Sequence, residues 1–471
     1  MPVGSISGIA SNLDTQAIVE AMLAYENNNG ILIQARQQEI TNKMSAWNSI
    51  SAYLLSFKAK ASILSRESAW HSKSLSNSDD SIFTATANTN ATPGVYNISV
   101  NSLAAQQQLA SQGFSSSTAA IGTGTIVIQV GENAAETITI DSTNNTLEGL
   151  RDAINDADAG VSASIINDGS SNNAYRLILT SEGTGLENSI DLTIDLADGT
   201  APDFTNTSFD TPETLSWDTN ATAEPSLGDT ASYTGTQNKI YTFTLQGSGE
   251  MTVGSGDIYI DWSDGTNSGT ITVSSADTEV ALSGDGSDGL KLKFSAGELY
   301  GGDTFQVQSF SPVLQEAGDA QIEVGNSSGG GSPILITSSS NTITNVIEGV
   351  TLNLLQVSDS GPNTLTVELD KNGIANTVQG LVQEYNTMVD YLGEMMDYNP
   401  DTETAGILIG DIGLMSLQNR VHRLMANPVA GLDSDLSRLL NIGVTTGVDG
   451  QLKFDRNVLF EKLDEDLEGV I

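Results

Sequence analysis

The sequence of 471 residues contains no cysteine and only two histidines, His71 and His422. Without cysteine, the chain can form no disulfide, no thiolate nucleophile and no cysteine-ligated zinc site. Two histidines also leave a transition-metal site short of ligands. We therefore expect no metal and no cofactor.

Basic residues are scarce as well. The chain has 18 Lys+Arg against 59 Asp+Glu, which gives a formal net charge of −41. Between Leu177 and Asp370 the basic residues are Lys239, Lys291 and Lys293 alone. A surface of that sign repels phosphate backbones and anionic lipid, so neither nucleic acid nor a membrane is an expected partner. The charge fits an exposed protein kept in solution by its acidity, or an acidic binding role.

Long apolar runs are also absent. No stretch reaches the roughly 20 apolar residues that a membrane helix needs. Residues 1–7 have neither a charged segment nor an apolar segment of the kind found in a cleavable signal peptide. We expect a protein that stays in the cytoplasm or leaves the cell by a route that reads no such signal.

Glycine is frequent, with 46 residues, and Ser, Thr and Asn are concentrated in the middle of the chain. This mixture is typical of β-domains with many turns. Helical periodicity is found mainly at the two ends. The predicted fold is therefore a multidomain α+β protein in which both ends form one helical leg and β-rich head domains are inserted between them.

At the N-terminal end, Asn12 or Asp14 can cap a helix that Asn27-Asn28-Asn29-Gly30 is expected to break. A longer helix is predicted over residues 31–66, which contain no proline or glycine. Its apolar positions repeat every seven residues, at Ile33, Ile40, Trp47, Leu54 and Ala61. This ladder is either a seam for another helix or the face of a helix packed on its own domain.

The middle of the chain alternates with period two. Residues 82–87 and 95–100 predict a hairpin around Pro93-Gly94, and residues 106–120 predict a polar connector. A compact β-β-α-β-β unit follows, with its helix capped by Asn145 or Thr146. Residues 201–310 predict only strands and turns, as in a sandwich or barrel.

Helical period returns after Asp370. A first helix ends near Asn399-Pro400, a second ends at Pro428, and a hairpin around Asp449-Gly450 precedes a last helix from Asp455. The predicted domains are residues 1–66 with 371–471, 67–112 with 312–370, 113–200, and 201–311.

Strings that look like catalytic motifs do not fit their surroundings. Residues 284–289 match the dinucleotide pattern G-x-G-x-x-G, but two carboxylates would repel a pyrophosphate and a strand follows instead of a helix. A Ca²⁺ turn is the other use of those carboxylates, although their spacing fits no loop with a full ligand set. Residues 325–329 match the nucleophile-elbow pattern within a Gly/Ser loop. His422, one of the two candidate general bases, is expected to be packed or solvated. Because no motif fits a catalytic site, we predict that the protein is not an enzyme.

Three stretches resemble the flagellar filament cap family, also called hook-associated protein 2. Residues 8–15 read Gly-Ile-Ala-Ser-Asn-Leu-Asp-Thr and run into a helix, as that family begins, and residues 91–96 are similar to a hairpin of the family. Residues 146–165 resemble a short motif shared by hook-associated proteins and flagellins. The third stretch, 339–446, includes Thr342-Ile343-Thr344 and Gly443-Val444-Thr445-Thr446. Residues 201–310 look like an extra head domain.

The resemblance implies a ring of about five identical subunits at the distal tip of the flagellum, with flagellin as partner. It also implies passage through the flagellar export apparatus, with a chaperone, and without cleavage. In the family, the chain continues beyond the point matching residues 464–471 with a helical segment that pairs with the N-terminal helix. We expect that segment to be missing from this sequence, which ends at Ile471.

Under this interpretation the helical leg carries the assembly interface. The residues predicted for leg packing or flagellin contact are Leu13, Asp14, Ile18, Ile33, Ile40, Trp47 and Leu54. Two other classes of protein stay open: another flagellar axial component, such as a junction protein or a flagellin, and an adhesin that uses the acidic head.

Overall fold

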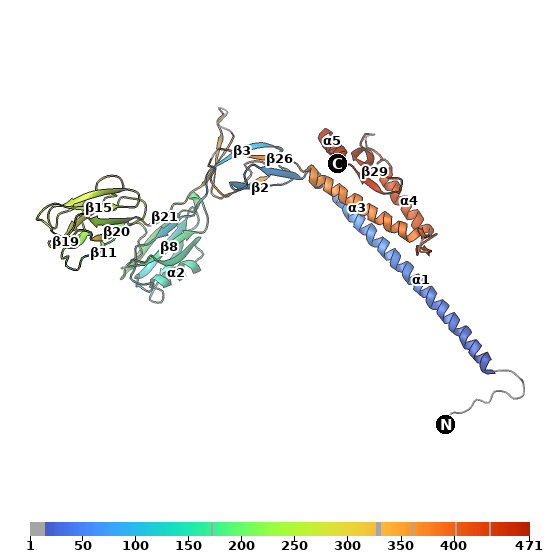
Figure 1. Cartoon of the computed structure of the whole chain (residues 1–471), viewed down its shortest axis with the longest axis horizontal. Coiled ribbons are helices and arrows are strands. Elements are labelled where there is room, and N and C mark those ends of the chain that lie inside the picture. The colour runs from blue at the N-terminus through green and yellow to red at the C-terminus, as the bar shows by residue number, and fades with distance from the viewer. Residues whose placement is uncertain (1–14, 171–172, 326–330, 360, 401–402, 433–434) are drawn as a thin grey trace, which may run out of the picture. The chain divides into compact units, whose positions relative to one another are not determined.

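A computed structural model describes residues 15–170, 173–325, 331–359, 361–400, 403–432 and 435–471 (Figure 1). The chain divides into two compact units. The first comprises residues 1–76, 87–94 and 367–471, and the second comprises residues 77–86 and 95–366. The mixed α+β class predicted from the sequence is confirmed.

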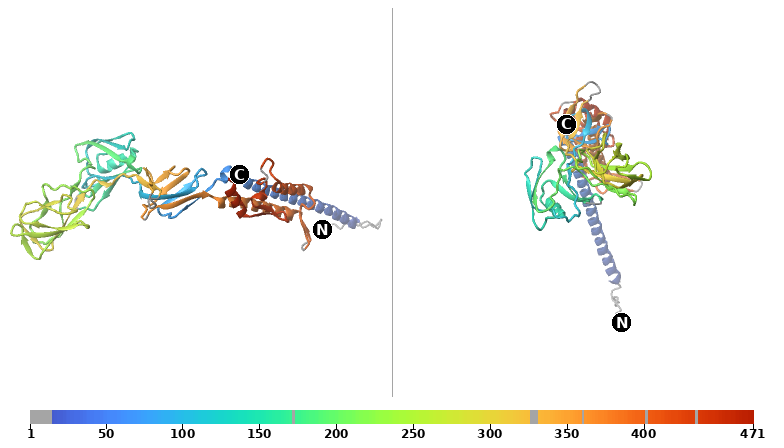
Figure 2. Two further views of the ribbon diagram at one scale, coloured as in Figure 1. Left: turned by 90° about the horizontal axis from the view of Figure 1, so that it is seen from above. Right: turned by 90° about the vertical axis from the view of Figure 1, so that its left-hand side faces the viewer.

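The first unit is mainly helical. The long α1 (Thr15–Leu64) lies beside α3 (Lys371–Met396) in Figure 1 and in the left-hand view of Figure 2. The other elements are η1 (Glu67–Ala69), β27 (Tyr398–Asn399), β28 (Thr404–Ala405), α4 (Ile412–Ala426), η4 (Leu439–Ile442), β29 (Val444–Thr446), β30 (Leu452–Phe454), α5 (Arg456–Glu465) and α6 (Leu467–Val470). Helices therefore come from both ends of the chain, as predicted.

Side-chain caps begin the C-terminal helices, and α3 and α5 start where the sequence predicts. Asp370 accepts a hydrogen bond from the backbone N–H of Gly373 at 2.8 Å and starts α3. Asp411 and Asp455 cap α4 and α5 in the same way. The inward face of α3 is buried at Ile374, Val378, Leu381, Tyr385, Met388 and Leu392. The predicted hairpin around Gly450 is confirmed as β29 and β30.

The predicted helix break at Asn27-Asn28-Asn29-Gly30 is wrong, because α1 runs through it as one helix of 50 residues. Glycine inside a helix costs about 1 kcal/mol relative to alanine, and asparagine up to about 0.7 kcal/mol. No proline removes a backbone hydrogen bond here, so the helical flanks carry the helix across the segment. The proposed caps Asn12 and Asp14 lie outside the described residues.

Strands at 73–102 and 320–369 form two sheets. The larger has the order β1 (Lys73–Asn77), β26 (Asn363–Leu369), β3 (Gly94–Ser102), β22 (Ala320–Val324), β23 (Ile334–Ser338). The smaller has the order β2 (Phe83–Ala87), β25 (Val350–Leu354), β24 (Thr342–Thr344). The predicted hairpin of β2 with β3 is wrong, since each of these strands pairs with strands about 250 residues away in the sequence and they lie in different sheets.

The region from residue 108 to 204 has its own core, formed by two sheets and α2 (Leu147–Asp156). Thr146 caps α2 by accepting from the Gly149 N–H at 3.1 Å, and Leu147, Leu150 and Ile154 are buried. The sheets have the orders β21 (Val313–Gln315), β4 (Gln108–Ala110), β8 (Tyr175–Ser181), β7 (Val161–Asn167), and β6 (Glu136–Ile140), β5 (Thr123–Val130), β9 (Ile190–Ala197). The predicted β-β-α-β-β order is confirmed, but β4 lies in the predicted connector and β9 was not predicted.

The region from residue 208 to 310 is all β, as predicted. A six-stranded sheet has the order β10 (Ser208–Phe209), β20 (Thr304–Phe310), β13 (Ile240–Leu245), β15 (Ile258–Ser263), β16 (Ser268–Val273), and β11 (Glu213–Ser216) also pairs with β20. Smaller sheets pair β12 (Pro225–Leu227), β18 (Lys291–Phe294) and β17 (Val280–Ala281), and β14 (Glu250–Thr252) with β19 (Glu298–Tyr300). Side chains of these sheets share one core, which includes Phe243, Trp262, Leu292 and Phe305.

Candidate assembly surface

The C-terminal half of α1 packs inside its own unit. Ala46 and Ile50 are buried, and Trp70 donates its indole N–H to the carbonyl of Leu64 at 2.8 Å. Half-buried side chains around them are Trp47, Tyr53, Leu54, Phe57 and Leu64. The rings of Tyr53 and Tyr391 lie 4.9 Å apart, and those of Phe57 and Tyr385 meet edge-on at 5.9 Å. These aromatic contacts attach this half of α1 to α3.

Among the described residues, none covers the N-terminal half of α1 in this way. Every residue from Gln16 to Asn42 is exposed, although many are large and apolar. The exposed large apolar residues of α1 between Ile18 and Met44 are Ile18, Val19, Met22, Leu23, Tyr25, Ile31, Leu32, Ile33, Ile40 and Met44. In Figure 1 this half of the helix extends beyond α3.

The exposed apolar residues are concentrated on one side of the helix. At 3.6 residues per turn, five of them fall within an arc of about 80°. These five residues, which we call the α1 stripe, are Ile18, Met22, Tyr25, Ile33 and Ile40. The opposite side carries polar residues such as Asn27, Gln34 and Gln38, together with the apolar Leu23 and Ile31. Asn29 and Arg36 fall within the arc of the stripe and interrupt it. A row of apolar residues on a solvent-exposed helix is nevertheless typical of a surface that another chain or segment covers.

Local contacts support the helix without covering the stripe. Lys43 Nζ lies 2.7 Å from Glu39 Oε1, and this hydrogen bond lowers the pKa of Glu39. The Gln38 amide donates to Asn42 Oδ1 at 2.9 Å. Each such pair at a spacing of four residues contributes only about 0.2–0.5 kcal/mol. A helix in a protein is stabilised mainly by packing of its apolar face. The exposed half of α1 lacks this stabilisation as long as nothing packs on the stripe.

The seven residues predicted for the interface fall into three groups. Leu13 and Asp14 lie outside the described residues. Ile18, Ile33 and Ile40 belong to the α1 stripe, with exposed fractions of 46%, 59% and 59%. Trp47 and Leu54 are half-buried in the core of the first unit.

The heptad ladder therefore serves two purposes. Ile33 and Ile40 face solvent, whereas Trp47 and Leu54 pack on the helix's own unit. Met22 and Tyr25 were not among the seven predicted residues, although a helical wheel drawn through the predicted break finds both. A role of all seven in assembly stays a prediction.

The glycine-rich string at 284–289 closes a turn. Asp288 Oδ2 accepts hydrogen bonds from Lys239 Nζ at 2.7 Å and from the Tyr241 hydroxyl at 2.8 Å. Lys239 Nζ also lies 3.0 Å from Asp264 Oδ2. The strand that follows is β18, and no helix begins there. A carboxylate of the loop is thus engaged within the domain. A phosphate site would instead need free backbone N–H groups at a helix N-terminus, and a strand follows here.

His422 is a packing partner of the helical core. Its Nδ1 lies 2.8 Å from the hydroxyl of Tyr385, whose side chain is fully buried. Burial raises the pKa of Tyr385 to about 12. Of the elbow-like string at 325–329, residues 326–329 lie outside the described residues.

The described residues lack two further kinds of feature. They contain no group of three or more His, Cys, Asp or Glu side chains placed to hold a metal ion. None of the helices among them is long and apolar enough to cross a membrane.

The fold and the α1 stripe define a multidomain α+β protein whose candidate site is an assembly surface. The family model described as flagellar hook-associated protein 2 N-terminus matches residues 11–107, and the model described as flagellar hook-associated protein 2 C-terminus matches residues 317–471. Together these two models match more than half of the sequence. The chain belongs to the flagellar hook-associated protein 2 family, the flagellar cap proteins. A third model, flagellin hook IN motif, matches residues 125–183.

Individual relatives agree with this family. The B-type flagellar hook-associated protein 2 of Pseudomonas aeruginosa strain PAO1 is 27% identical over 446 residues, which cover 92% of this chain and 72% of that protein. Flagellar hook-associated protein 2 of Escherichia coli K12 is 37% identical over 191 residues, or 40% of each chain. The crystal structure of the D1-D2-D3 domains of the flagellar cap protein FliD from Escherichia coli matches with a TM-score of 0.55 and 27% identity, and the match covers 90% of this chain and 89% of that one.

Proposed function

We propose that this protein caps the distal end of the bacterial flagellar filament, where it promotes the folding and insertion of exported flagellin. Membership of the hook-associated protein 2 family and the similarity to a flagellar cap protein support this function. The observation that carries it is the α1 stripe, an apolar surface exposed along one side of a helix. A subunit that assembles with copies of itself and with incoming flagellin needs such a surface.

In this proposal the domains have separate tasks. Residues 1–66 with 371–471 form a leg that faces flagellin, and residues 67–112 with 312–370, 113–200 and 201–311 form the head. Copies of the chain close into a ring of about five subunits, since closed symmetry is the rule for soluble homo-oligomers. The protein is exported through the flagellar apparatus with a chaperone, without cleavage, and acts outside the cell at the filament tip.

The proposed role is structural rather than catalytic, in keeping with the relatives, which are cap and hook-associated proteins. A flagellin or junction protein is the less favoured alternative. The motif at 125–183 is named after flagellin and would suit either. The two hook-associated protein 2 models, which match the N-terminal and C-terminal regions, favour the cap.

The function is tested by deleting the gene in its own host and complementing it with wild-type and variant genes. We expect the deleted strain to release flagellin monomer into the medium without building filaments, and the wild-type gene to restore filaments. The double variant Ile33→Asp with Ile40→Asp places two charges in the α1 stripe and should fail to restore them. Filament number by electron microscopy and flagellin in the medium by immunoblot are the two measurements.

The matched control carries Asn27→Asp and Gln34→Asp, which add the same charge on the opposite side of α1. We expect this control to restore filaments. Normal filaments in the deleted strain would contradict the cap function. Equal activity of both double variants would show that the stripe is not the assembly surface.

A further inference from the structure

The strand β23 exposes large apolar side chains at the edge of the five-stranded sheet in the second unit. It is the last strand of that sheet, and among the described residues β22 alone pairs with it. Ile334 and Leu335 of β23 are 67% and 56% exposed. The side of β23 that faces away from β22 therefore presents a row of free backbone N–H and C=O groups to solvent.

The apolar face of the sheet continues onto this edge strand. In the strand register, Ile98 of β3 lies opposite Val324 of β22, and Val324 lies opposite Ile334. Residues opposite one another lie on the same face of a sheet. A second row on this face consists of Val100, Ile322 and Ile336. Because Ile98 is fully buried and Ile334 is exposed, the apolar face extends one strand further than the groups that cover it.

β23 lacks the features that protect edge strands in soluble proteins. Its sequence, Ile334-Leu335-Ile336-Thr337-Ser338, contains no charged residue and no proline, and it pairs with β22 without a bulge. The edge strand β6, by contrast, carries Glu136. A regular, apolar and unprotected edge is a site where another strand is expected to add to the sheet.

Charge favours a second copy of this chain as the source of that strand. The net charge of −41 makes two copies repel each other wherever their acidic surfaces meet. Residues 324–347 contain no Asp, Glu, Lys, Arg or His, and neither does β3. The carboxylate of Glu323 on β22 accepts a hydrogen bond from the Asn101 amide at 3.1 Å. At β23 two copies can therefore approach with little repulsion, and a partner recognised by its charge finds no charged side chain on the strand.

We propose that β23 pairs antiparallel with β23 of a second copy, across a twofold axis at Ile336. All five residues then pair, with Leu335 of one copy opposite Thr337 of the other. A twofold axis perpendicular to the sheet keeps both apolar faces on the same side, so Ile334 and Ile336 of the two copies form one continuous apolar surface. Such a contact uses the same patch on both copies and joins them in pairs. It is separate from the contacts between neighbours in a ring and does not depend on the cap function.

The absence of cysteine makes a cross-linking test direct, since one introduced cysteine is the only thiol in the chain. In the proposed pair, the two Thr337 side chains lie diagonally across the twofold axis, roughly 7–8 Å apart. The full chain carrying Thr337→Cys is treated with a short bismaleimide and analysed by denaturing gel electrophoresis. We expect a linked dimer of twice the 49.3 kDa chain. Thr137→Cys, also an exposed threonine on an edge strand, is the matched control and should stay monomeric on the gel.

Two further measurements test the nature of the contact. Adding Leu335→Lys to Thr337→Cys sets like charges near each other across the axis and should lower the yield of dimer roughly fivefold or more. Adding Leu215→Lys instead places the same charge on β11, at a residue 54% exposed, and should leave the yield unchanged. Raising NaCl from about 0.05 M to about 0.5 M should increase the yield, because salt screens the repulsion between copies. Circular dichroism checks that each variant is folded.

Three results would each overturn the proposal. The first is a yield of dimer for Thr337→Cys no higher than that for Thr137→Cys. The second is an equal effect of Leu335→Lys and Leu215→Lys. The third is a yield that falls as salt is added, because that dependence belongs to a contact between opposite charges.

Discussion

The hydroxyl of Tyr385 lies 2.8 Å from Nδ1 of His422 and 3.3 Å from the carbonyl oxygen of Gly450. Tyr385 belongs to α3, His422 to α4, and Gly450 to the turn between β29 and β30. One buried hydroxyl thus joins three elements that are separate in the sequence. This contact belongs to the packing of the first unit, and it allows the stability of that unit to be tested apart from assembly.

Replacing Tyr385 with Phe should change how stability depends on alkaline pH. Burial raises the pKa of Tyr385 to about 12 in the folded protein, whereas an unfolded tyrosine titrates near about 10. Because the folded pKa is raised, this contribution to stability is complete below about pH 10 and is lost as the pH rises toward 12. The variant should be less stable by about 1 kcal/mol at pH 8, for the lost hydrogen bond, and should lack this alkaline loss.

Urea unfolding followed by helical circular dichroism, measured from pH 8 to 11.5, checks this prediction. The difference between wild type and Tyr385→Phe should shrink as the pH rises through this range. A constant difference would show that Tyr385 does not titrate on unfolding.

Substitutions of two isoleucines of α1 should distinguish residues needed for folding from residues needed for assembly. Ile50 is buried, with an exposed fraction of 1%, while Ile40 in the α1 stripe is 59% exposed. Ile50→Ala should destabilise the first unit by about 2–5 kcal/mol, since it removes buried methyl groups and leaves a cavity. Ile40→Ala should change stability by no more than about 0.5 kcal/mol. In complementation, Ile40→Ala should lower the number of filaments although the protein is folded.

Chemical denaturation of both purified variants gives the stabilities, and filament counts give assembly. Equal destabilisation by the two substitutions would contradict the division of α1 into a packed half and an exposed half.

The glycine-rich string at 284–289 offers a matched pair of substitutions. Gly284 and Gly289 both have positive φ, at 97° and 82°. A Cβ at Gly284 would meet nothing within 4 Å, whereas one at Gly289 would lie 2.2 Å from the carbonyl oxygen of Ser232. Gly284→Ala should cost about 1–2 kcal/mol for the strained backbone alone, and Gly289→Ala should cost clearly more. Thermal unfolding of the two variants measures the difference, and equal costs would contradict the described turn.

Local signals in the sequence predict the elements well, and pairing over long distances poorly. Thr146, Asp370, Asp411 and Asp455 cap helices where an acid or a threonine precedes an apolar period of 3.6. The hairpin at Gly450 was found because a two-residue turn signal fixes its partner. The strands β2 and β3 were paired incorrectly, because nothing in residues 83–102 indicates that their partners are supplied by residues 320–369.

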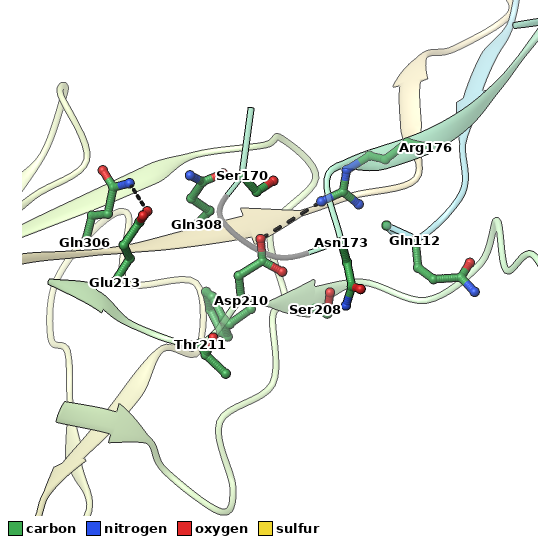
Figure 3. A pocket seen from close by; sticks show the side chains of 12 residues that line it. Gln112, Ser170, Asn173, Arg176, Ser208, Asp210, Thr211, Glu213, Gln306 and Gln308 are labelled. Carbon is green, nitrogen blue, oxygen red and sulfur yellow. Dashed lines mark hydrogen bonds and ion pairs between the residues drawn. The ribbon is translucent and has the colours of Figure 1, made fainter. Parts of the chain in front are cut away.

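The candidate site shows the same limit. The apolar stripe can be found from the sequence once α1 is read as one helix, because its signal is periodic and local. The sequence does not show which residues of the ladder stay exposed, because that depends on where the contact between α1 and α3 ends. The polar cavity beside β10, β11 and β20 (Figure 3) could not be predicted from the sequence, because its lining residues Arg176, Asp210 and Gln308 come together only through the fold.

The ionic cluster around Lys239 should make the all-β region sensitive to acid. The side chain of Asp264 is only 1% exposed and lies 3.0 Å from Lys239 Nζ. Although burial raises it, hydrogen bonds from the backbone N–H groups of Asn267 and Thr266 and from Lys239 hold the pKa of Asp264 well below its ordinary range. A depressed carboxyl pKa contributes stability that is present above the ordinary value of about 3.9 and is lost as the pH falls below it.

Asp264→Ala should therefore cost about 1.5–3 kcal/mol at pH 7, because it removes hydrogen bonds to a charged group while Lys239 keeps its ion pair with Asp288. The difference from wild type should narrow as the pH falls below about 4, where the wild-type carboxylate begins to lose its advantage. Asp285→Ala removes the same charge from an exposed position of the neighbouring loop and should cost less than about 0.5 kcal/mol at every pH. Urea unfolding followed by tryptophan fluorescence detects this region through Trp262 in its core, and the signal of Trp47 and Trp70 from the first unit is the same in wild type and variants. If Asp264→Ala and Asp285→Ala unfold at the same urea concentration, Lys239 and Asp264 do not stabilise the domain as a pair.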